Sequence, residues 1–534
     1  MLDLLIQNVS IVDGSGAPAA LGCVGCRDGA LVMNPPADTP ARDIIDGSGL
    51  HVTPGFIDTH SHGDLPLGKT YNSLAKLSQG VTTHVGGQCG FSVFPVDPGR
   101  LAATQDNMAI LTDEFPAEMG TFTSFSRYLA YAGGLPLPEN IAFFMGHGSL
   151  RTAAMGFDNR PATPYELDHM KQMLEDALHS GVFGLSSGLI YIPGVYAPKE
   201  ELTALCRILA KHDAVYATHI RDESDFVLQS LEEAIQMGRQ TGCRVHVSHL
   251  KACGKKNHGL SEQMLDLIHR ANAEGICVTA DQYPYNAGMT HLNTCIPPAY
   301  FSRGVAGMVV HLKSPETRRE IRSQMQQDGG GYENFYLSSG GWPGILVAAA
   351  ENTPEAEGKT IAEYAEMVGA DPFDVFFDIL MQNNGVASAI YFHMDEQDVI
   401  RIMKDPYVVI GSDGIVKGRY IKTHPRAYGT FPRAIKAYAL EKGIMSLEEI
   451  VHKMTGKSAR ILRLPKKGLL RDGMDADLAL LDLNTLRDTA DYVNPCALSQ
   501  GIVATVVGGQ IVYRDQALTG ACPGRVIRAE QEGL

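Results

Sequence analysis

The 534-residue sequence lacks the features that mark two large classes of protein. No stretch approaches the roughly 18 consecutive apolar residues of a membrane-spanning helix. Basic residues are too few for a broad phosphate-binding surface, since 45 Lys and Arg face 60 Asp and Glu, a formal net charge of −15. We therefore expect neither membrane insertion nor nucleic-acid binding, and we expect a small molecule as the partner. The oligomeric state stays open.

Dense cysteine and a signal peptide are also missing. The 10 cysteines are spread along the whole chain, unlike those of a small disulfide-rich secreted domain. The chain starts with MLDLLIQNVSIVDG, which has neither the basic start nor the unbroken apolar core of a signal peptide. We expect a soluble protein of a reducing, cytoplasmic compartment. Cys23 and Cys26 form a CxxC without a partner pair, and we predict no metal or redox role for them.

The middle of the chain repeats a strand–helix pattern. Short apolar runs at 141–145, 215–218 and 408–410 alternate with amphipathic helical stretches such as 198–212 and 224–241. Repeated βα units predict a parallel sheet, and this many units favour a closed TIM-type (β/α)8 barrel over an open α/β sheet. We assign residues 57–463 to this barrel.

Both ends of the chain are rich in strand-like sequence instead. Such runs lie at 5–12, 476–482 and 502–507, separated by turn signals. We expect residues 1–56 and 464–534 to pair into a small β-sandwich domain. Segment 290–365 interrupts the barrel rhythm with paired prolines and a Gly triplet, and it is too long for a connecting loop. It predicts an insertion at the barrel mouth.

Metal-binding residue types recur where the strand-like runs end. His60 and His62 close the first run, two residues apart, so both side chains point to one face of the strand. Paired imidazoles at this spacing suit a divalent metal. Later runs end in or near Cys89, His219, His249 and Asp413. Because the carboxyl ends of barrel strands meet at one face, these side chains are expected to surround one pocket and to form a metal site.

The segments around these residues resemble a known family. PGFIDTHSH at 54–62 looks like the first-strand signature of the amidohydrolase superfamily, and GLLRDGMDADL at 468–478 looks like its return to the β domain. More specifically, the chain is similar to the D-aminoacylases, the N-acyl-D-amino-acid deacylases. Supporting segments are GLIYIPG at 188–194, THIRDE at 218–223, SHLK at 248–251, YPY at 283–285, GSDG at 411–414 and HPR at 424–426.

The resemblance implies a zinc centre with a cysteine ligand. Many amidohydrolases bridge two metals with a carboxylated Lys after the fourth strand, but residues 183–189 contain no Lys. The D-aminoacylase branch uses a Cys after the second strand instead. The implied tight zinc site consists of Cys89, His219 and His249. A second, weaker site would consist of His60, His62 and, as a further candidate, Asp413, bridged by Cys89. A soft thiolate with imidazoles suits zinc.

The implied activity is the hydrolysis of N-acyl-D-amino acids by metal-activated water. Zinc lowers the pKa of bound water and polarises the amide carbonyl. Asp413 would act as general base and then as general acid, or else only as a metal ligand. The resemblance assigns the substrate carboxylate to Lys251, Arg426 and Tyr191, with Tyr283 as an additional donor. The basic stretch before Arg426 contains further candidates for this role: Lys417, Arg419 and Lys422.

Two other functions compete with this one. A cyclic-amide hydrolase of the hydantoinase or dihydroorotase type would be expected to carry the bridging Lys that is missing here. A non-catalytic scaffold protein of the same fold would have lost metal ligands, whereas every ligand position is filled. Fold analogy alone does not decide among these functions, and the residues of the metal site distinguish them.

Some residues near the expected mouth have less defined roles. His147 and His393 also end strand-like runs, and we expect them to support the ligands rather than to bind metal. Arg303 and Lys313 lie in the insertion and would suit an acidic substrate if they faced the pocket, although surface positions are at least as consistent. We expect neutral, apolar side chains on the substrate.

Overall fold

The computed structural model describes residues 1–36, 38–109, 111–112, 114–418 and 421–529. Within these residues, parallel strands form two hydrogen-bonded groups, β6-β7-β8 and β9-β10-β11-β12-β13-β17. The first group comprises β6 (Phe56–Asp58), β7 (Val81–Gly86) and β8 (Asn140–Phe143). The second comprises β9 (Met145–Gly146), β10 (Gly184–Gly188), β11 (Val215–His219), β12 (Arg244–Val247), β13 (Val278–Gln282) and β17 (Val408–Ile410).

Backbone contacts join the two groups into a closed barrel. Phe144 separates β8 from β9 and donates its N–H to Gly86 O at 3.0 Å, so β8 and β9 act as one strand beside β7. At the other seam, Ser61 pairs in parallel with Gly414, just beyond β6 and β17. Strands such as β7 and β17 are buried along their whole length, as expected for a parallel sheet covered on both faces. The predicted TIM-type (β/α)8 barrel is confirmed.

Amphipathic helices surround the barrel. They include α1 (Thr70–Leu77), α5 (Pro164–Ser180), α6 (Lys199–Lys211), α7 (Val227–Thr241), α8 (Ser261–Ala273), α14 (Glu396–Lys404) and α16 (Leu447–Met454). The predicted helices at 198–212 and 224–241 correspond to α6 and α7. Local sequence explains their limits: α5 begins at a capping box of Thr163 and Glu166 and ends at Gly181 in the left-handed conformation. None of the described helices has the length and apolar character needed to cross a bilayer.

The two chain ends meet in one sheet, nine-stranded within the described residues. Its strands are β1 (Leu2–Ile11), β2 (Ala20–Arg27), β3 (Ala30–Met33), β4 (Ala41–Asp46), β5 (His51–Pro54), β18 (Leu478–Leu481), β19 (Ile502–Val507), β20 (Gln510–Arg514) and β21 (Ala517–Leu518). Antiparallel pairing of β5 with β18, Thr53 opposite Ala479, joins the N-terminal strands to the C-terminal ones. Cys23 and Cys26 lie in β2 as free thiols. We propose that residues 1–56 and 464–534 form this β domain and that residues 57–463 form the barrel.

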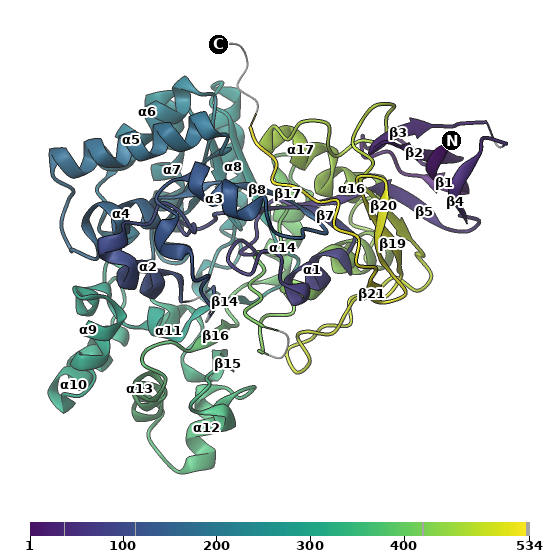
Figure 1. The fold of residues 1–534 in the computed structure, drawn as a ribbon. Helices are drawn as coiled ribbons and strands as arrows, with labels where there is room; N and C mark the ends of the chain where they lie inside the picture. Colours follow the sequence, from purple (N-terminus) through teal and green to yellow (C-terminus); the bar gives the residue numbers. More distant parts are fainter. Residues whose placement is uncertain (37, 110, 113, 419–420, 530–534) are drawn as a thin grey trace.

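The last described residues depart from that division. Val526 pairs in parallel with Ile141 of β8, Ile527 donates its N–H to Ile141 O at 2.7 Å, and Ala529 donates to Gly181 O at 2.8 Å. In Figure 1 the yellow C-terminal trace leaves the β sheet and crosses to the barrel. The buried Ile527 side chain explains why this short segment docks there, although it carries no strand pattern of its own.

An insertion between β13 and α14 forms a lobe below the barrel in Figure 1. Its antiparallel sheet consists of β14 (Gly288–His291), β15 (Ile345–Ala349) and β16 (Ser388–Tyr391), and its helices include α9 (Gly304–His311), α10 (Pro315–Met325), α11 (Phe335–Ser338), α12 (Ile361–Val368) and α13 (Pro372–Gln382). The lobe has its own hydrophobic core, which contains Trp342. The lobe spans 288–391, whereas the sequence pattern placed it at 290–365, because α12, α13 and β16 continue the strand–helix rhythm typical of a barrel.

Candidate metal centre

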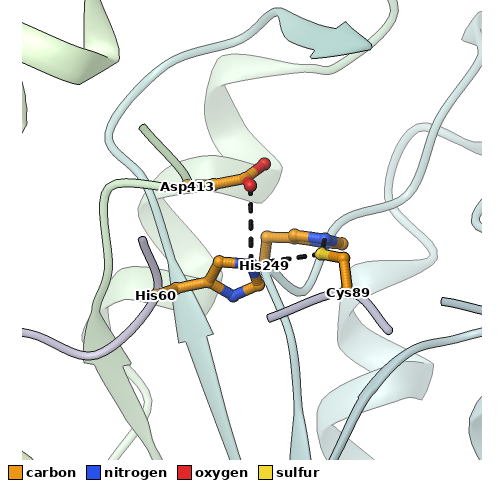
Figure 2. Close-up of side chains that lie close together, drawn as sticks. All are labelled: His60, Cys89, His249 and Asp413. Carbon is orange, nitrogen blue, oxygen red and sulfur yellow. Dashed lines mark hydrogen bonds and ion pairs between the residues drawn. The ribbon is translucent and has the colours of Figure 1, made fainter. Parts of the chain in front are cut away.

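Four buried side chains converge at the carboxyl ends of the barrel strands (Figure 2). His60 follows β6, Cys89 follows β7, His249 follows β12 and Asp413 follows β17. Cys89 Sγ lies 3.2 Å from His60 Nε2 and 3.4 Å from His249 Nε2. Asp413 Oδ1 lies 3.4 Å from His60 Nε2. A thiol, two imidazoles and a carboxylate thus present their ligand atoms within 4.8 Å of one another.

A second group of possible ligands adjoins the first and shares His249 with it. It consists of His219, Glu223 and His249. His219 Nε2 lies 3.4 Å from Glu223 Oε2, and the His219 and His249 rings are 4.4 Å apart between centroids. His62 joins from the other side, with Nε2 at 3.1 Å from Asp413 Oδ1. The structure therefore brings the six predicted metal-site residues into one continuous cluster.

Unusual backbone conformations aim three of these side chains. Cys89, His249 and Asp413 have φ angles of 52°, 37° and 48°, in the left-handed region that non-glycine residues rarely adopt. Such conformations persist only where the surrounding structure enforces them, and they are frequent at functional sites. The turn before Cys89 needs Gly87, because a Cβ there would lie 2.0 Å from Phe144 O.

Asp281, near the end of β13, orients the histidines around it. Its Oδ2 lies 3.2 Å from His60 Nδ1 and 2.9 Å from His246 Nε2, and its Oδ1 accepts the His249 N–H at 2.7 Å. With Nδ1 engaged, His60 presents Nε2 to the centre, an arrangement common behind metal-binding histidines.

Burial and neighbouring charges together set the pKa values in the cluster. Burial lowers the pKa of His219 and of His249 well below the usual value, so both imidazoles are neutral, as metal ligands must be. It raises the pKa of the Cys89 thiol, so a thiolate needs a cation beside it. Burial would also raise the pKa of Asp413, but the charge of Arg426 and the neighbouring histidines hold it well below its usual range.

Several buried nitrogens lack a hydrogen-bond partner among the described residues. In the metal cluster they include Nδ1 and Nε2 of His219 and Nδ1 of His62. A buried polar atom without a partner is costly and calls for an explanation such as a bound ion. Together with the thiol and the carboxylates, these nitrogens form a donor set that fits zinc.

The predicted substrate-binding residues lie around this centre. Lys251 Nζ donates to Glu223 Oε1 at 2.6 Å, and Arg426 Nη2 lies 2.8 Å from Asp413 Oδ2. Both cations lie over the Tyr283 ring, at 5.7 and 4.6 Å from its centroid. The Tyr191 ring is 5.2 Å from that of His219. Each cation therefore already has a carboxylate partner.

Comparison with known proteins places this arrangement in a family. The model of the amidohydrolase family matches residues 43–322 and 342–513. The chain is 34% identical to an N-acyl-D-aspartate deacylase and 35% identical to a D-aminoacylase, both of Alcaligenes xylosoxydans xylosoxydans, over 98% of this chain and 95% and 97% of those proteins. The chain belongs to the D-aminoacylase branch of the amidohydrolase family.

A solved structure supports the same assignment of this amidohydrolase. It is the N-acyl-D-glutamate deacylase of Bordetella bronchiseptica, complexed with zinc and with a phosphonate inhibitor that mimics the tetrahedral intermediate. It is 33% identical and aligns with a TM-score of 0.83 over 99% of this chain and 100% of its own. The resemblance inferred from the sequence motifs is confirmed.

Other predicted residues of this amidohydrolase lie outside the cluster. Lys417 Nζ donates to Ala109 O at 2.8 Å, and Lys422 faces Glu357 at 3.9 Å, so their charges are directed elsewhere, while Arg419 lies outside the described residues. His147 Nε2 lies 2.8 Å from Glu201 Oε1. His393 Nε2 lies 3.5 Å from Cys253 Sγ, and burial lowers its pKa to about 3.

Sequence reasoning missed two carboxylates of the site. Glu223 lies 3.0 Å from His249 Nδ1 and accepts a hydrogen bond from Lys251. Its segment, THIRDE, is one of the family motifs, but the sequence assigned Glu223 no role. Asp281 occupies a strand end like the predicted ligands do. Its position at the end of a buried strand was the available signal.

Proposed function

We propose that this amidohydrolase binds zinc and hydrolyses N-acyl-D-amino acids to a carboxylic acid and a free D-amino acid. One observation carries the proposal: Cys89 Sγ lies between His60 Nε2 and His249 Nε2, at 3.2 and 3.4 Å, beside the ionised Asp413. The relatives support it, because those named above are deacylases of N-acyl-D-amino acids, or a D-aminoacylase, and one of them is complexed with zinc.

The ligands divide into two sites that share the thiolate. Cys89, His219 and His249 would hold the tight zinc, and His60, His62 and Asp413 would form a second, weaker site bridged by Cys89. Zinc held there supplies a water of lowered pKa and polarises the scissile carbonyl. Glu223 would keep His249 oriented through Nδ1, at 3.0 Å.

Asp413 would move the proton. Its Oδ2 is held by Arg426 at 2.8 Å, while Oδ1 faces His60 and His62 at 3.4 and 3.1 Å. Oδ1 would accept a proton from the attacking water and deliver it to the leaving amine nitrogen. Because Arg426 keeps the pKa of Asp413 low, the carboxylate is ionised and ready to accept at neutral pH.

The substrate carboxylate would bind beside this proton carrier. Arg426 Nε is buried without a partner among the described residues and leaves a donor for an incoming carboxylate. Lys251, Tyr191 and Tyr283 would add a charge and two hydroxyl donors. With the carboxylate and the scissile amide both fixed, only one enantiomer has room for its side chain, and the activities named for the relatives favour D.

The cyclic-amide alternative finds no support at the fourth strand. Ser186 of β10 donates its hydroxyl to Gly87 O at 2.5 Å and accepts the Gly90 N–H at 3.0 Å, where a bridging Lys would otherwise be expected near the centre. The scaffold alternative would require lost ligands, and none of the six is lost.

Amine release from paired N-acetyl-D- and N-acetyl-L-amino acids tests the proposal. We expect turnover of D substrates, loss of turnover after zinc is removed by a chelator, and recovery when zinc is added back. Hydantoin and dihydropyrimidines serve as matched cyclic substrates. Preferential hydrolysis of the cyclic amides, or of L substrates, would refute the proposed function.

A further inference from the structure

The proposed function leaves the side chain of the substrate undefined. The three relatives specify D-aspartate, D-glutamate or no particular D-amino acid by name, yet their identities to this chain are 34%, 33% and 35%. Identity therefore does not choose among them. We propose that a cavity between the barrel mouth and the insertion binds the substrate side chain and selects uncharged, apolar ones. This inference rests on the proposed function.

The cavity has the size and lining of an apolar side-chain pocket. Its volume is about 130 Å³. A buried apolar cavity of about 150 Å³ accommodates benzene, so this one suits a branched aliphatic or benzyl group. Its apolar lining includes Phe91, Ile190 and Ile192 from the barrel mouth and Ile296 and Phe335 from the insertion.

One wall of the cavity adjoins the metal centre. The Phe91 ring lies 6.5 Å from the His62 ring and 5.1 Å from the Tyr191 ring, and Tyr191 in turn packs 5.2 Å from His219. Phe91 and Tyr191 therefore lie both in the cavity wall and against histidines of the metal centre.

Another wall reaches the proposed carboxylate anchors. Glu333 from the insertion lines the cavity, and its Oε2 accepts the Glu223 N–H at 3.1 Å. Glu223 in turn holds Lys251 Nζ at 2.6 Å. Because the carboxylate and the side chain of an amino acid leave the same α-carbon, a pocket next to the carboxylate anchors is the place for the side chain.

Within the described residues, the cavity offers an acidic substrate no free cation. Asp106 and Glu333 both line it, and burial raises the pKa of each. The lining cation, Arg221, is engaged, since it pairs with Glu233 at 2.9 Å and donates to two backbone carbonyls. Arg303 and Lys313 are exposed and do not line the cavity. A carboxylate of D-Asp or D-Glu buried here would thus meet no uncommitted cation among the described lining residues.

Neutral polar groups in the lining do not reverse this preference. Asn107 Nδ2, Tyr332 Oη, His291 Nδ1 and Glu333 Oε1 are buried without partners among the described residues. They tolerate a polar, uncharged atom such as the Met sulfur, but a neutral donor binds a carboxylate much less strongly than a cation does.

A side-chain series tests the inference on the zinc-loaded enzyme. We expect kcat/KM for N-acetyl-D-leucine, -methionine and -phenylalanine to exceed that for N-acetyl-D-aspartate, -glutamate and -lysine by roughly 100-fold or more, the scale of discrimination by a shaped pocket. Preference for the aspartate or glutamate substrate, or for the lysine one, would overturn the inference and leave the deacylase function intact. Absence of any N-acyl-D-amino acid hydrolysis would reject both.

A filled-cavity variant tests the location. Ile190→Phe should lower kcat/KM for N-acetyl-D-leucine relative to N-acetyl-D-alanine by roughly 10–200-fold. Because both substrates are measured on one variant, a loss of folded protein cancels in this ratio. Met367→Phe, at an exposed position of α12 in the insertion, is the control and should leave the ratio unchanged.

A third pair of substrates separates the side chain from the acyl group. N-acetyl- and N-butyryl-D-alanine differ only in the acyl chain, and Ile190→Phe should affect both equally. If the variant instead penalises the butyryl substrate and spares N-acetyl-D-leucine, the cavity holds the acyl group and the inference is wrong.

Discussion

Two histidines at the ends of the strands that flank β10, His147 and His219, look alike in sequence but differ in their surroundings. Both are buried. His147 follows β9 and has its Nε2 2.8 Å from Glu201 Oε1, and Arg151 completes the ion cluster with Glu201 at 2.6 Å. His219 ends β11, and neither of its ring nitrogens has a hydrogen-bond partner among the described residues, although Glu223 Oε2 lies 3.4 Å from its Nε2. The difference teaches that a position at a strand end does not by itself identify a metal ligand, because the Nε2 of His147 is committed to an ion cluster with Glu201 and Arg151.

The largest expected effect follows from removing the thiol that the metal centre shares. Cys89→Ala should lose both bound zinc and turnover, because Cys89 Sγ contacts His60 and His249 and bridges the two proposed sites. Metal analysis beside an amine-release assay measures both. Cys206→Ala, another buried free thiol, in α6, is the matched control and should keep zinc. A Cys89 variant with full zinc and full activity would disprove the bridging role.

A smaller effect is expected from neutralising the proton carrier. Asp413→Asn should keep the zinc held by Cys89, His219 and His249, yet lower kcat by roughly 10²–10⁴, the usual contribution of general acid–base catalysis. Steady-state kinetics with metal analysis checks this. Asp398→Asn, a buried carboxylate that bonds Ser261 and Arg401, is the control and should leave kcat unchanged. A near-normal kcat in Asp413→Asn would show that Asp413 does not transfer the proton and acts only as a metal ligand.

The anchors of the substrate carboxylate come next. Lys251→Met should lower kcat/KM for N-acyl-D-amino acids. The loss should correspond to about 1.5–3 kcal/mol of transition-state binding, the scale of a hydrogen bond to a charged group. An N-acyl amine that lacks the carboxylate should already be a poor substrate of the wild type, and Lys251→Met should hardly lower its kcat/KM further. Arg426→Met should lower kcat as well, because Arg426 also holds Asp413 Oδ2 at 2.8 Å. Equal losses on both substrates would place the carboxylate pocket elsewhere.

The contrast between the two histidines also separates what the sequence could predict from what it could not. The sequence predicted strands such as β17 and β19 with their bounds, because the pattern of apolar residues is a local property. The positions at the ends of such strands then identified the candidate ligands. Partners were not predictable. Glu223 and Lys251 are 28 residues apart, and their contact depends on how two βα loops fold over the mouth.

The same limit explains the remaining differences. Nothing in the isolated segment near Ile527 indicates that it will pair with Ile141, since only the assembled barrel provides that edge. Likewise, β16 resembles a barrel strand in sequence, and only its antiparallel pairing with β14 and β15 assigns it to the insertion.

The smallest effect on activity is expected at the ion cluster of His147, Arg151 and Glu201. Glu201→Gln should leave zinc content and kcat unchanged but lower the free energy of unfolding at pH 7 by about 3 kcal/mol, because it leaves the buried Arg151 without its counter-charge. Chemical denaturation followed by fluorescence or circular dichroism measures the change. Glu200→Gln, at the exposed neighbouring position, is the matched control and should leave stability nearly unchanged.

The loss of unfolding free energy in Glu201→Gln should depend on pH in a way that identifies its cause. Burial alone would raise the pKa of Glu201, but the hydrogen bond to His147 and the charges of His147 and Arg151 outweigh it and lower the pKa from 4.5 to about 2. A carboxyl whose pKa is lowered in the folded state adds stability that is complete above its unfolded pKa and is lost as pH falls towards the folded one. The gap between wild type and Glu201→Gln should therefore be widest above pH 4.5 and should close between about 4.5 and 2. A gap that stays constant across this range would mean that Glu201 stabilises the fold through packing and not through its charge.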